Sequence, residues 1–142
     1  MAMKTILLVD IEIESLFGIS DNLARLGYGT IAMQDGQTAL SVIEDGMPID
    51  LVIVAEKTHG IDGLSLLGLI KERFPYIPSI MLAECCSIET YLKARSLGAF
   101  EYISKSVRLI ELGRIVKEAL EAGHVIEDAH GVLERTLSLH TV

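Results

Sequence analysis

Five short apolar runs alternate with longer amphipathic stretches along this chain, and this alternation is the feature that most limits its possible folds. The runs cover residues 5–9, 28–33, 50–55, 79–83 and 99–103. Their length and their richness in Ile, Val and Leu are typical of strands that are buried on both faces, as parallel strands between helices are. The pattern therefore predicts an α/β domain.

The stretches between the runs have the periodicity and the end signals of helices. Apolar residues recur at helical spacing before Gly27, which predicts a first helix that ends there. Asp35 and Ser87 stand where the N-caps of the second and fourth helices are expected, and Pro75 must end the third. A fifth helix is expected over about residues 106–120.

Strict alternation of five strands and five helices predicts a doubly wound parallel sheet with helices on both faces. For five strands, the flavodoxin-like order 2-1-3-4-5 is the leading arrangement. A site would then lie beyond the carboxyl ends of the first, third and fourth strands, where the strand order reverses. This rule directs attention to residues 10–12, 55–63 and 83–86.

The acidic balance of the chain argues against two classes of partner. Lys and Arg number 12 and Asp and Glu number 20, which gives a formal net charge of −8. Nucleic acids and anionic membrane surfaces favour clustered positive charge, so we expect neither as a partner of this domain. No apolar run approaches the roughly 20 residues that span a bilayer, and the first residues do not read as a signal peptide. We therefore expect a cytoplasmic protein.

Two cysteines, Cys85 and Cys86, are adjacent in the sequence. A disulfide between neighbours is strained, and free cysteines commonly pack as small buried hydrophobes. No further cysteine accompanies them, and no histidine stands at a suitable spacing for a shared metal site. We expect free thiols with a structural role.

Four segments near the expected carboxyl ends of strands carry a family resemblance. They are LLVDIE at residues 7–12, GIDG at 60–63, IMLA at 80–83 and FEYISKS at 100–106. In this order and spacing they resemble the receiver domain of two-component response regulators, over about residues 4–121. The resemblance implies a receiver-like domain at residues 1–121, followed at 122–142 by a C-terminal helical extension or the start of a linker.

The resemblance implies a particular chemistry at the edge of the sheet. In this family an aspartate after the third strand accepts a phosphoryl group, and acidic residues after the first strand hold a divalent cation beside it. A Ser or Thr after the fourth strand and a Lys after the fifth engage the phosphoryl group. A carboxylate nucleophile needs a hard cation to screen the incoming phosphate, and Mg²⁺ prefers oxygen ligands.

This chain departs from the family pattern at three of these positions. Ala55 stands at the phosphoacceptor position, Ile11 at the second acid and Ala83 at the hydroxyl position. A methyl group cannot attack phosphorus, so the resemblance implies a degenerate site with no catalytic residue, no metal ligand set and no Mg²⁺ cofactor. The remnant of the site consists of Asp10, Glu12, Tyr102 and Lys105.

Three remaining side chains have open interpretations. Lys105 is expected to be solvated or paired with Asp10 or Glu12. Glu56, a possible substitute acid, either remains a surface glutamate or turns inward and pairs with Lys105, which would give a permanently active-like state. Because Ala83 is small, we expect Tyr102 to rest inward and to hold the domain in one state.

The leading interpretation is an atypical, pseudo-receiver domain in two-component phosphorelay signal transduction. It would act through protein–protein contact, not as an enzyme. The expected partners are a histidine kinase, another regulator or an output domain. By resemblance, the docking surface is formed by the fourth helix, the fifth strand and the fifth helix (residues 87–120), and it also offers a face for a homodimer.

Two other functions remain open. One is a phosphorylatable response regulator with Glu12 or Glu56 as a substitute acceptor. The other is a small-molecule-binding flavodoxin-like domain, which is disfavoured because no Gly-rich loop follows the first run and residues 11–14 would repel an anion. Apolar residues at 126, 129, 133 and 137 also predict a helical seam. This seam either packs on its own domain or serves as a dimer interface or stalk.

Overall fold

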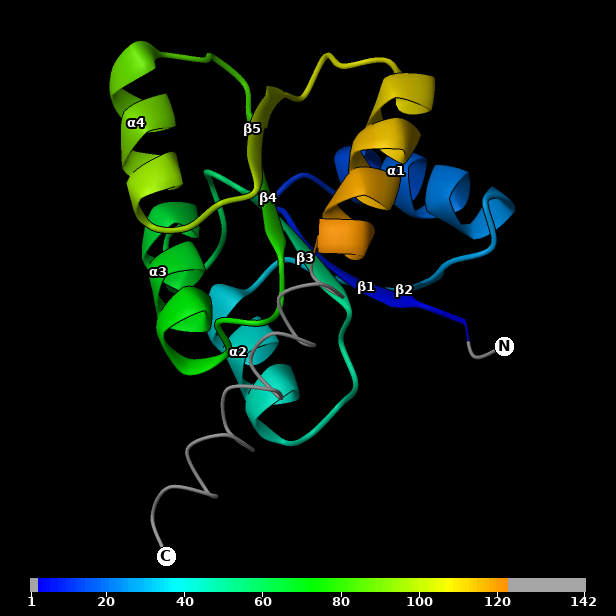
Figure 1. Ribbon diagram of the computed structural model, residues 1–142, viewed down its shortest axis with the longest axis horizontal. Coiled ribbons are helices and arrows are strands. Elements are labelled where there is room, and N and C mark those ends of the chain that lie inside the picture. The colour runs from blue at the N-terminus through cyan, green and yellow to red at the C-terminus, as the bar shows by residue number, and fades with distance from the viewer. Residues whose placement is uncertain (1–2, 123–142) are drawn as a thin grey trace, which may run out of the picture.

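The computed structural model describes residues 3–122 and contains five strands that alternate with helices (Figure 1). The strands are β1 (Thr5–Val9), β2 (Gly29–Met33), β3 (Leu51–Ala55), β4 (Ser79–Ala83) and β5 (Glu101–Ser104). The helices are α1 (Ile13–Arg25), α2 (Gly36–Glu44), α3 (Gly63–Arg73) and α4 (Ile88–Ser96). Residues 109–122 are also helical and are called the last helical segment below.

The sheet confirms the predicted topology. Its strand order is β2-β1-β3-β4-β5, and every neighbouring pair runs parallel. Figure 1 shows α1 and the last helical segment on one face, and α2, α3 and α4 on the other. This is the doubly wound arrangement that strict alternation of strands and helices requires.

Two apolar clusters, one on each face of the sheet, hold the layers together. Along β1, Ile6 and Leu8 join the cluster beneath α1, while Leu7 and Val9 join the cluster beneath α2 and α3. This alternation follows from the two-residue period of a strand, and it explains why the strands are apolar throughout instead of alternating with polar residues. Of the residues of α4, only Ala94 is buried.

The helix ends are largely those that the sequence predicts. The carboxylate of Asp35 accepts hydrogen bonds from the backbone N–H groups of Gln37 and Thr38, and the Ser87 hydroxyl accepts one from Thr90. The fifth helix begins later than predicted, at residue 109, because Val107 N–H donates to the Ser104 carbonyl and closes a turn first.

The apolar seam at residues 126–137 lies outside the described residues. Within residues 3–122, none of the helices combines the length and the apolar character needed to cross a membrane.

Gly63, at the start of α3, allows this helix to pack directly against the end of β3. A Cβ atom at Gly63 would lie 2.0 Å from the Ala55 carbonyl oxygen and 2.9 Å from the Glu56 Cα. Both neighbours are backbone atoms and cannot rotate aside. The close approach also lets Gly63 N–H donate to the Glu56 carbonyl at 3.0 Å, which fixes the loop beside the candidate site.

We expect Gly63→Ala to lower the free energy of unfolding by roughly 1–3 kcal/mol, because the helix must shift to relieve the clash. Gly18→Ala is the matched control, since nothing lies within 4 Å of the corresponding Cβ in the middle of α1. Gly18→Ala should raise the free energy of unfolding by about 0.5–1 kcal/mol, because Ala is a better helix former than Gly. Urea unfolding measures the free energy of unfolding of both variants. Equal changes in the two would contradict the close packing of Gly63 against the backbone of Ala55 and Glu56.

Candidate functional site

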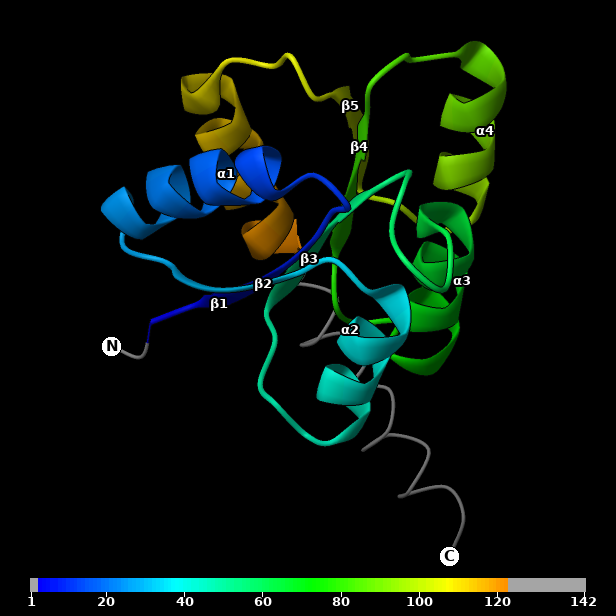
Figure 2. The same cartoon turned by 180° about the vertical axis from the view of Figure 1, so that it is seen from behind.

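The carboxyl ends of the strands bring the predicted site residues to one edge of the sheet. The loops that follow β3, β4 and β5 leave from this edge (Figure 2). Asp10 directly follows β1, Glu56 follows β3, and Lys105 follows β5. Backbone hydrogen bonds from Asp10 N–H to the Met33 carbonyl and from Lys105 N–H to the Ala83 carbonyl fix two of these positions.

Lys105 forms a largely buried ion pair with Asp10. Its Nζ donates to Asp10 Oδ1 at 2.8 Å and to Glu12 Oε1 at 3.2 Å. The side chains of Asp10 and Lys105 are only 3% and 14% exposed, whereas that of Glu12 is 45% exposed. The predicted pairing of Lys105 with Asp10 or Glu12 is therefore confirmed, and it involves both acids.

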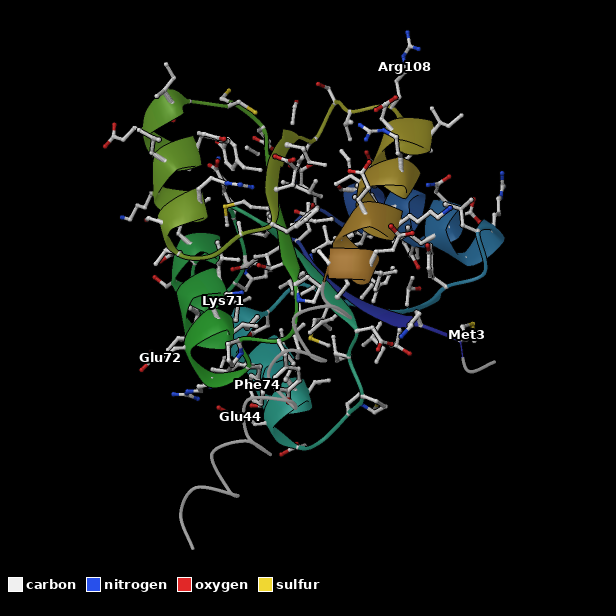
Figure 3. All side chains as sticks on the ribbon, viewed as in Figure 1. Met3, Glu44, Lys71, Glu72, Phe74 and Arg108 are labelled. Carbon is white, nitrogen blue, oxygen red and sulfur yellow. The ribbon has the colours of Figure 1, made fainter. Side chains whose placement is uncertain are left out.

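The surroundings of Lys105 favour its charged form. Burial alone would lower the pKa of the Lys105 ammonium, but hydrogen bonds and charge interactions with Asp10 and Glu12 outweigh this effect and raise it. Arg108, three residues further along the chain, instead projects outward from the domain (Figure 3). Lys105 thus faces the acidic edge, and Lys57 also acts on the charges of Glu12 and Glu84.

Glu84 joins the acidic edge; the sequence analysis covered it within residues 83–86 but gave it no role. Its contact with Glu12 raises the pKa of the Glu84 carboxyl. The same contact, followed by the hydrogen bond from Lys105, lowers the pKa of Glu12. The two carboxyls therefore hold a proton on Glu84 more readily than on Glu12. The signal in the sequence was its place directly after the fourth apolar run.

The residues at this edge do not fit a magnesium site. Asp10 Oδ2 is buried and makes no hydrogen bond of its own, although Lys105 Nζ lies 2.8 Å away. One such oxygen is too few, because Mg²⁺ takes a near-octahedral set of oxygen ligands. Among residues 3–122, no group of three or more His, Cys, Asp or Glu side chains is arranged to hold a metal ion. The ammonium of Lys105 already lies between Asp10 and Glu12.

Ala55 and Ala83 end the neighbouring strands β3 and β4, and both are fully buried. Neither side chain carries an oxygen atom. A hollow of about 20 Å³ lies nearby, lined by Glu56, Lys57, Leu82, Glu84 and Lys105. Pockets for organic ligands usually measure roughly 300–1,000 Å³, so this hollow has room only for something of the size of a water molecule.

Glu56 contacts Tyr102, so both expectations for this residue were wrong. Its N–H donates to the Leu82 carbonyl at 3.1 Å, which continues the ladder between β3 and β4 by one residue. The strand period then directs the side chain to the face where Tyr102 packs. Glu56 is consequently neither a plain surface glutamate nor the partner of Lys105.

Tyr102 lies inward, as predicted, with 7% of its surface exposed. Its hydroxyl donates to Glu56 Oε1 at 2.9 Å and accepts a long hydrogen bond of 3.4 Å from Ser87 N–H. The Tyr91 ring of α4 packs edge-to-face against it, with ring centroids 6.0 Å apart. Burial, followed by the hydrogen bond to Glu56, raises the pKa of the Tyr102 phenol.

Cys85 and Cys86 are free and both are exposed, in the loop between β4 and α4. The expectation that they pack as buried hydrophobes was wrong. The loop leaves the sheet at Ala83 and regular structure resumes only at Ile88, so both cysteines lie in an irregular segment at the surface.

Comparisons with known proteins point to one family. Residues 6–117 match the family model of the response regulator receiver domain. A putative response regulator NtrX-like protein of Rickettsia felis is 32% identical over 123 residues, which cover 85% of this chain and 26% of the relative. The regulatory protein AtoC of Escherichia coli is 32% identical over 120 residues, which cover 84% and 26%. This chain thus spans about a quarter of the length of these curated relatives.

Solved structures agree with these relatives. A CheY-like response regulator receiver domain protein from Methanospirillum hungatei JF-1 superposes with a TM-score of 0.81 at 26% identity, covering 87% of this chain and 98% of that one. The receiver domain of NtrX from Brucella abortus gives a TM-score of 0.76 at 33% identity, covering 82% and 98%.

Replacing Lys105 with Met tests the buried ion pair. We expect the free energy of unfolding at neutral pH to fall by roughly 3–5 kcal/mol, because the Asp10 carboxylate stays buried without its partner. Asp10→Asn in the same chain should restore part of this loss. Arg25→Met is the surface control: its pair with Asp21 is exposed, and its loss should cost at most about 0.5 kcal/mol.

The ion pair also predicts how stability depends on pH in the wild type. Because the pKa of Lys105 is raised above its ordinary value of 10.5, the stabilisation is present at neutral pH and is lost as the pH rises through the raised value. Urea unfolding at several alkaline pH values measures this loss, which Lys105→Met should not show. Identical alkaline profiles of the two proteins would contradict the assignment.

Replacing Glu56 with Ala tests its contact with Tyr102. We expect the pKa of Tyr102 to fall towards its ordinary value of 10.0, because the phenol loses a carboxylate that favours its neutral form. Glu56→Gln keeps a carbonyl acceptor without the charge and should give an intermediate value. NMR titration of the tyrosine rings measures the three pKa values, and a Tyr102 that titrates identically in all of them would rule the contact out.

Proposed function

Because this chain belongs to the response regulator receiver domain family, we propose that it is a pseudo-receiver in phosphorelay signalling, which works by protein contact without phosphorylation at the usual aspartate position. The most direct support for this proposal is that position 55 is occupied by alanine. The family's acceptor position corresponds to this residue, whose methyl group offers no nucleophile for phosphorus. The side chains of Ile11 and Ala83, at two further family positions, also lack oxygen atoms.

The ion pair between Lys105 and Asp10 supports a site that works without a metal. In the family, a divalent cation balances the acidic residues after the first strand. Here the Lys105 ammonium lies within hydrogen-bonding distance of both Asp10 and Glu12. A positive charge carried by the chain itself therefore neutralises part of this acidic edge, and we propose that the domain binds no Mg²⁺ in its working state.

The contact between Glu56 and Tyr102 supports a domain that is held in one state. In the family, the matching aromatic side chain moves as the hydroxyl after the fourth strand moves, and Ala83 has no hydroxyl. Tyr102 instead donates to a carboxylate that is always present. Its inward position therefore does not depend on an added phosphoryl group.

The exposed face of α4 supports a docking surface for a protein partner. Ile88 and Leu92 are 79% and 59% exposed, and Tyr91 lies beside them at helical spacing. Apolar side chains that adjoin one another on one exposed helix face are typical of protein contact sites. By resemblance to the family, we propose that this surface continues across β5 and the last helical segment.

We propose that the partner of this surface is a histidine kinase, another regulator, an output domain or a second copy of the chain, in the cytoplasm. The relatives named above are regulatory proteins about four times as long as the matched region. The matched region makes up only about a quarter of the length of these relatives. This share is consistent with a domain that controls or joins another protein module. Catalysis plays no part in the proposal.

Two alternatives have weaker support. A substitute acceptor would have to be Glu12 or Glu56, but Glu12 is engaged by Lys105 and Glu84, and Glu56 by Tyr102. A small-molecule ligand at this edge would need far more room than the hollow of about 20 Å³ provides.

Incubation with Mg²⁺ and acetyl phosphate tests the proposal. We expect the intact mass of the wild-type chain to stay unchanged, because no carboxylate stands at the acceptor position. The double variant Ile11→Asp/Ala55→Asp supplies the two missing acids and should gain the mass of one phosphoryl group. A phosphoryl group on Glu12, Glu56 or any other carboxylate of the wild type would overturn the proposal in favour of a phosphorylatable regulator.

A further inference from the structure

Two thiols stand side by side on the loop between β4 and α4, and the proposed function uses neither. Cys85 and Cys86 are both exposed and unbonded to each other. We propose that they form a redox modification site, at which a small-molecule disulfide such as glutathione disulfide converts the pair into a disulfide between neighbours. This modification changes the start of α4.

The reaction proceeds by two thiol–disulfide exchanges and needs no other reactant. One cysteine thiolate attacks the small disulfide, forms a mixed disulfide and releases one small thiol. The adjacent cysteine then attacks the protein sulfur of the mixed disulfide, forms the Cys85–Cys86 bond and expels the second small thiol. Two electrons pass from the cysteines to the small disulfide, and the two thiol protons end on the released thiols.

Closing this bond must bend the loop. Adjacent Cα atoms are about 3.8 Å apart across a trans peptide, whereas ordinary disulfides join Cα atoms roughly 4.4–6.8 Å apart. Because the Cα–Cα distance across the Cys85–Cys86 peptide is fixed, the strain falls on this peptide bond, on the disulfide torsions and on the φ and ψ angles of the two cysteines, and the changed φ and ψ redirect the chain that enters Ser87. A strained and exposed disulfide is also easily reduced, which makes the modification reversible.

Ser87 transmits the change, because it directly follows the cysteine pair. Its hydroxyl caps α4 by accepting from Thr90 N–H at 3.1 Å. Its own N–H donates to the Tyr102 hydroxyl at 3.4 Å, the longer of the two hydrogen bonds that hold this phenol. Bending the loop therefore alters both the α4 cap and the surroundings of Tyr102. The effect on partner docking rests on the proposed function, whereas formation of the disulfide does not.

Mass spectrometry and NMR test the site in the full chain. We expect glutathione disulfide at neutral pH to lower the intact mass by about 2 Da, the loss of two thiol hydrogens, with full reversal by dithiothreitol. The loss should map to the tryptic peptide of residues 74–93, which holds both cysteines. The NMR signals of the Ser87 amide and the Tyr102 ring should shift on oxidation.

Two sets of variants serve as controls. Cys85→Ser and Cys86→Ser should each retain one glutathione adduct, because the second exchange has no thiol, and the double variant should show neither adduct nor NMR shift. Stable adducts or intermolecular dimers of the wild type would overturn the proposal, as would oxidation that leaves Ser87 and Tyr102 unshifted. A positive acetyl phosphate result would instead overturn the proposed function while leaving the mass loss in place.

Discussion

The ion pair between Lys105 and Asp10 is the interaction on which the carboxyl edge of this domain depends. Lys105 follows the edge strand β5, and Asp10 follows β1, with β3 and β4 between them in the sheet. The pair therefore spans the ends of four strands. A carboxylate as buried as that of Asp10 is tolerated only when an opposite charge compensates it, so the position of Lys105 is a condition for the fold as well as a feature of the site.

A second interaction, from Glu56 to Tyr102, joins the same edge to α4. The carboxylate lies at the end of β3, and the tyrosine on β5 contacts both Ser87 and Tyr91 through its hydroxyl and its ring. Residues of the chain itself thus connect the end of β3 to the start of the fourth helix.

The fold could be predicted almost completely from the sequence, because apolar runs and helix end signals are local. Asp35 and Ser87 cap their helices as predicted. The site could be predicted only in part. The pairing of Lys105 follows from strand order, and the strand period gives the face of Glu56, but the contact of Glu56 with Tyr102 and that of Glu84 with Glu12 depend on how side chains far apart in the sequence meet. No local sequence pattern indicates which distant side chains come into contact.

The slight anchoring of α4 has a consequence for how the domain moves. Its single buried residue, Ala94, contributes little apolar contact, while its outer face is exposed. A helix held so weakly opens locally at a much smaller free energy than the whole domain needs to unfold. α4 is therefore expected to open at a lower free energy than the sheet. A partner that binds its outer face would have to compete only with the contacts that Ala94, Tyr91 and Ser87 make with the rest of the domain.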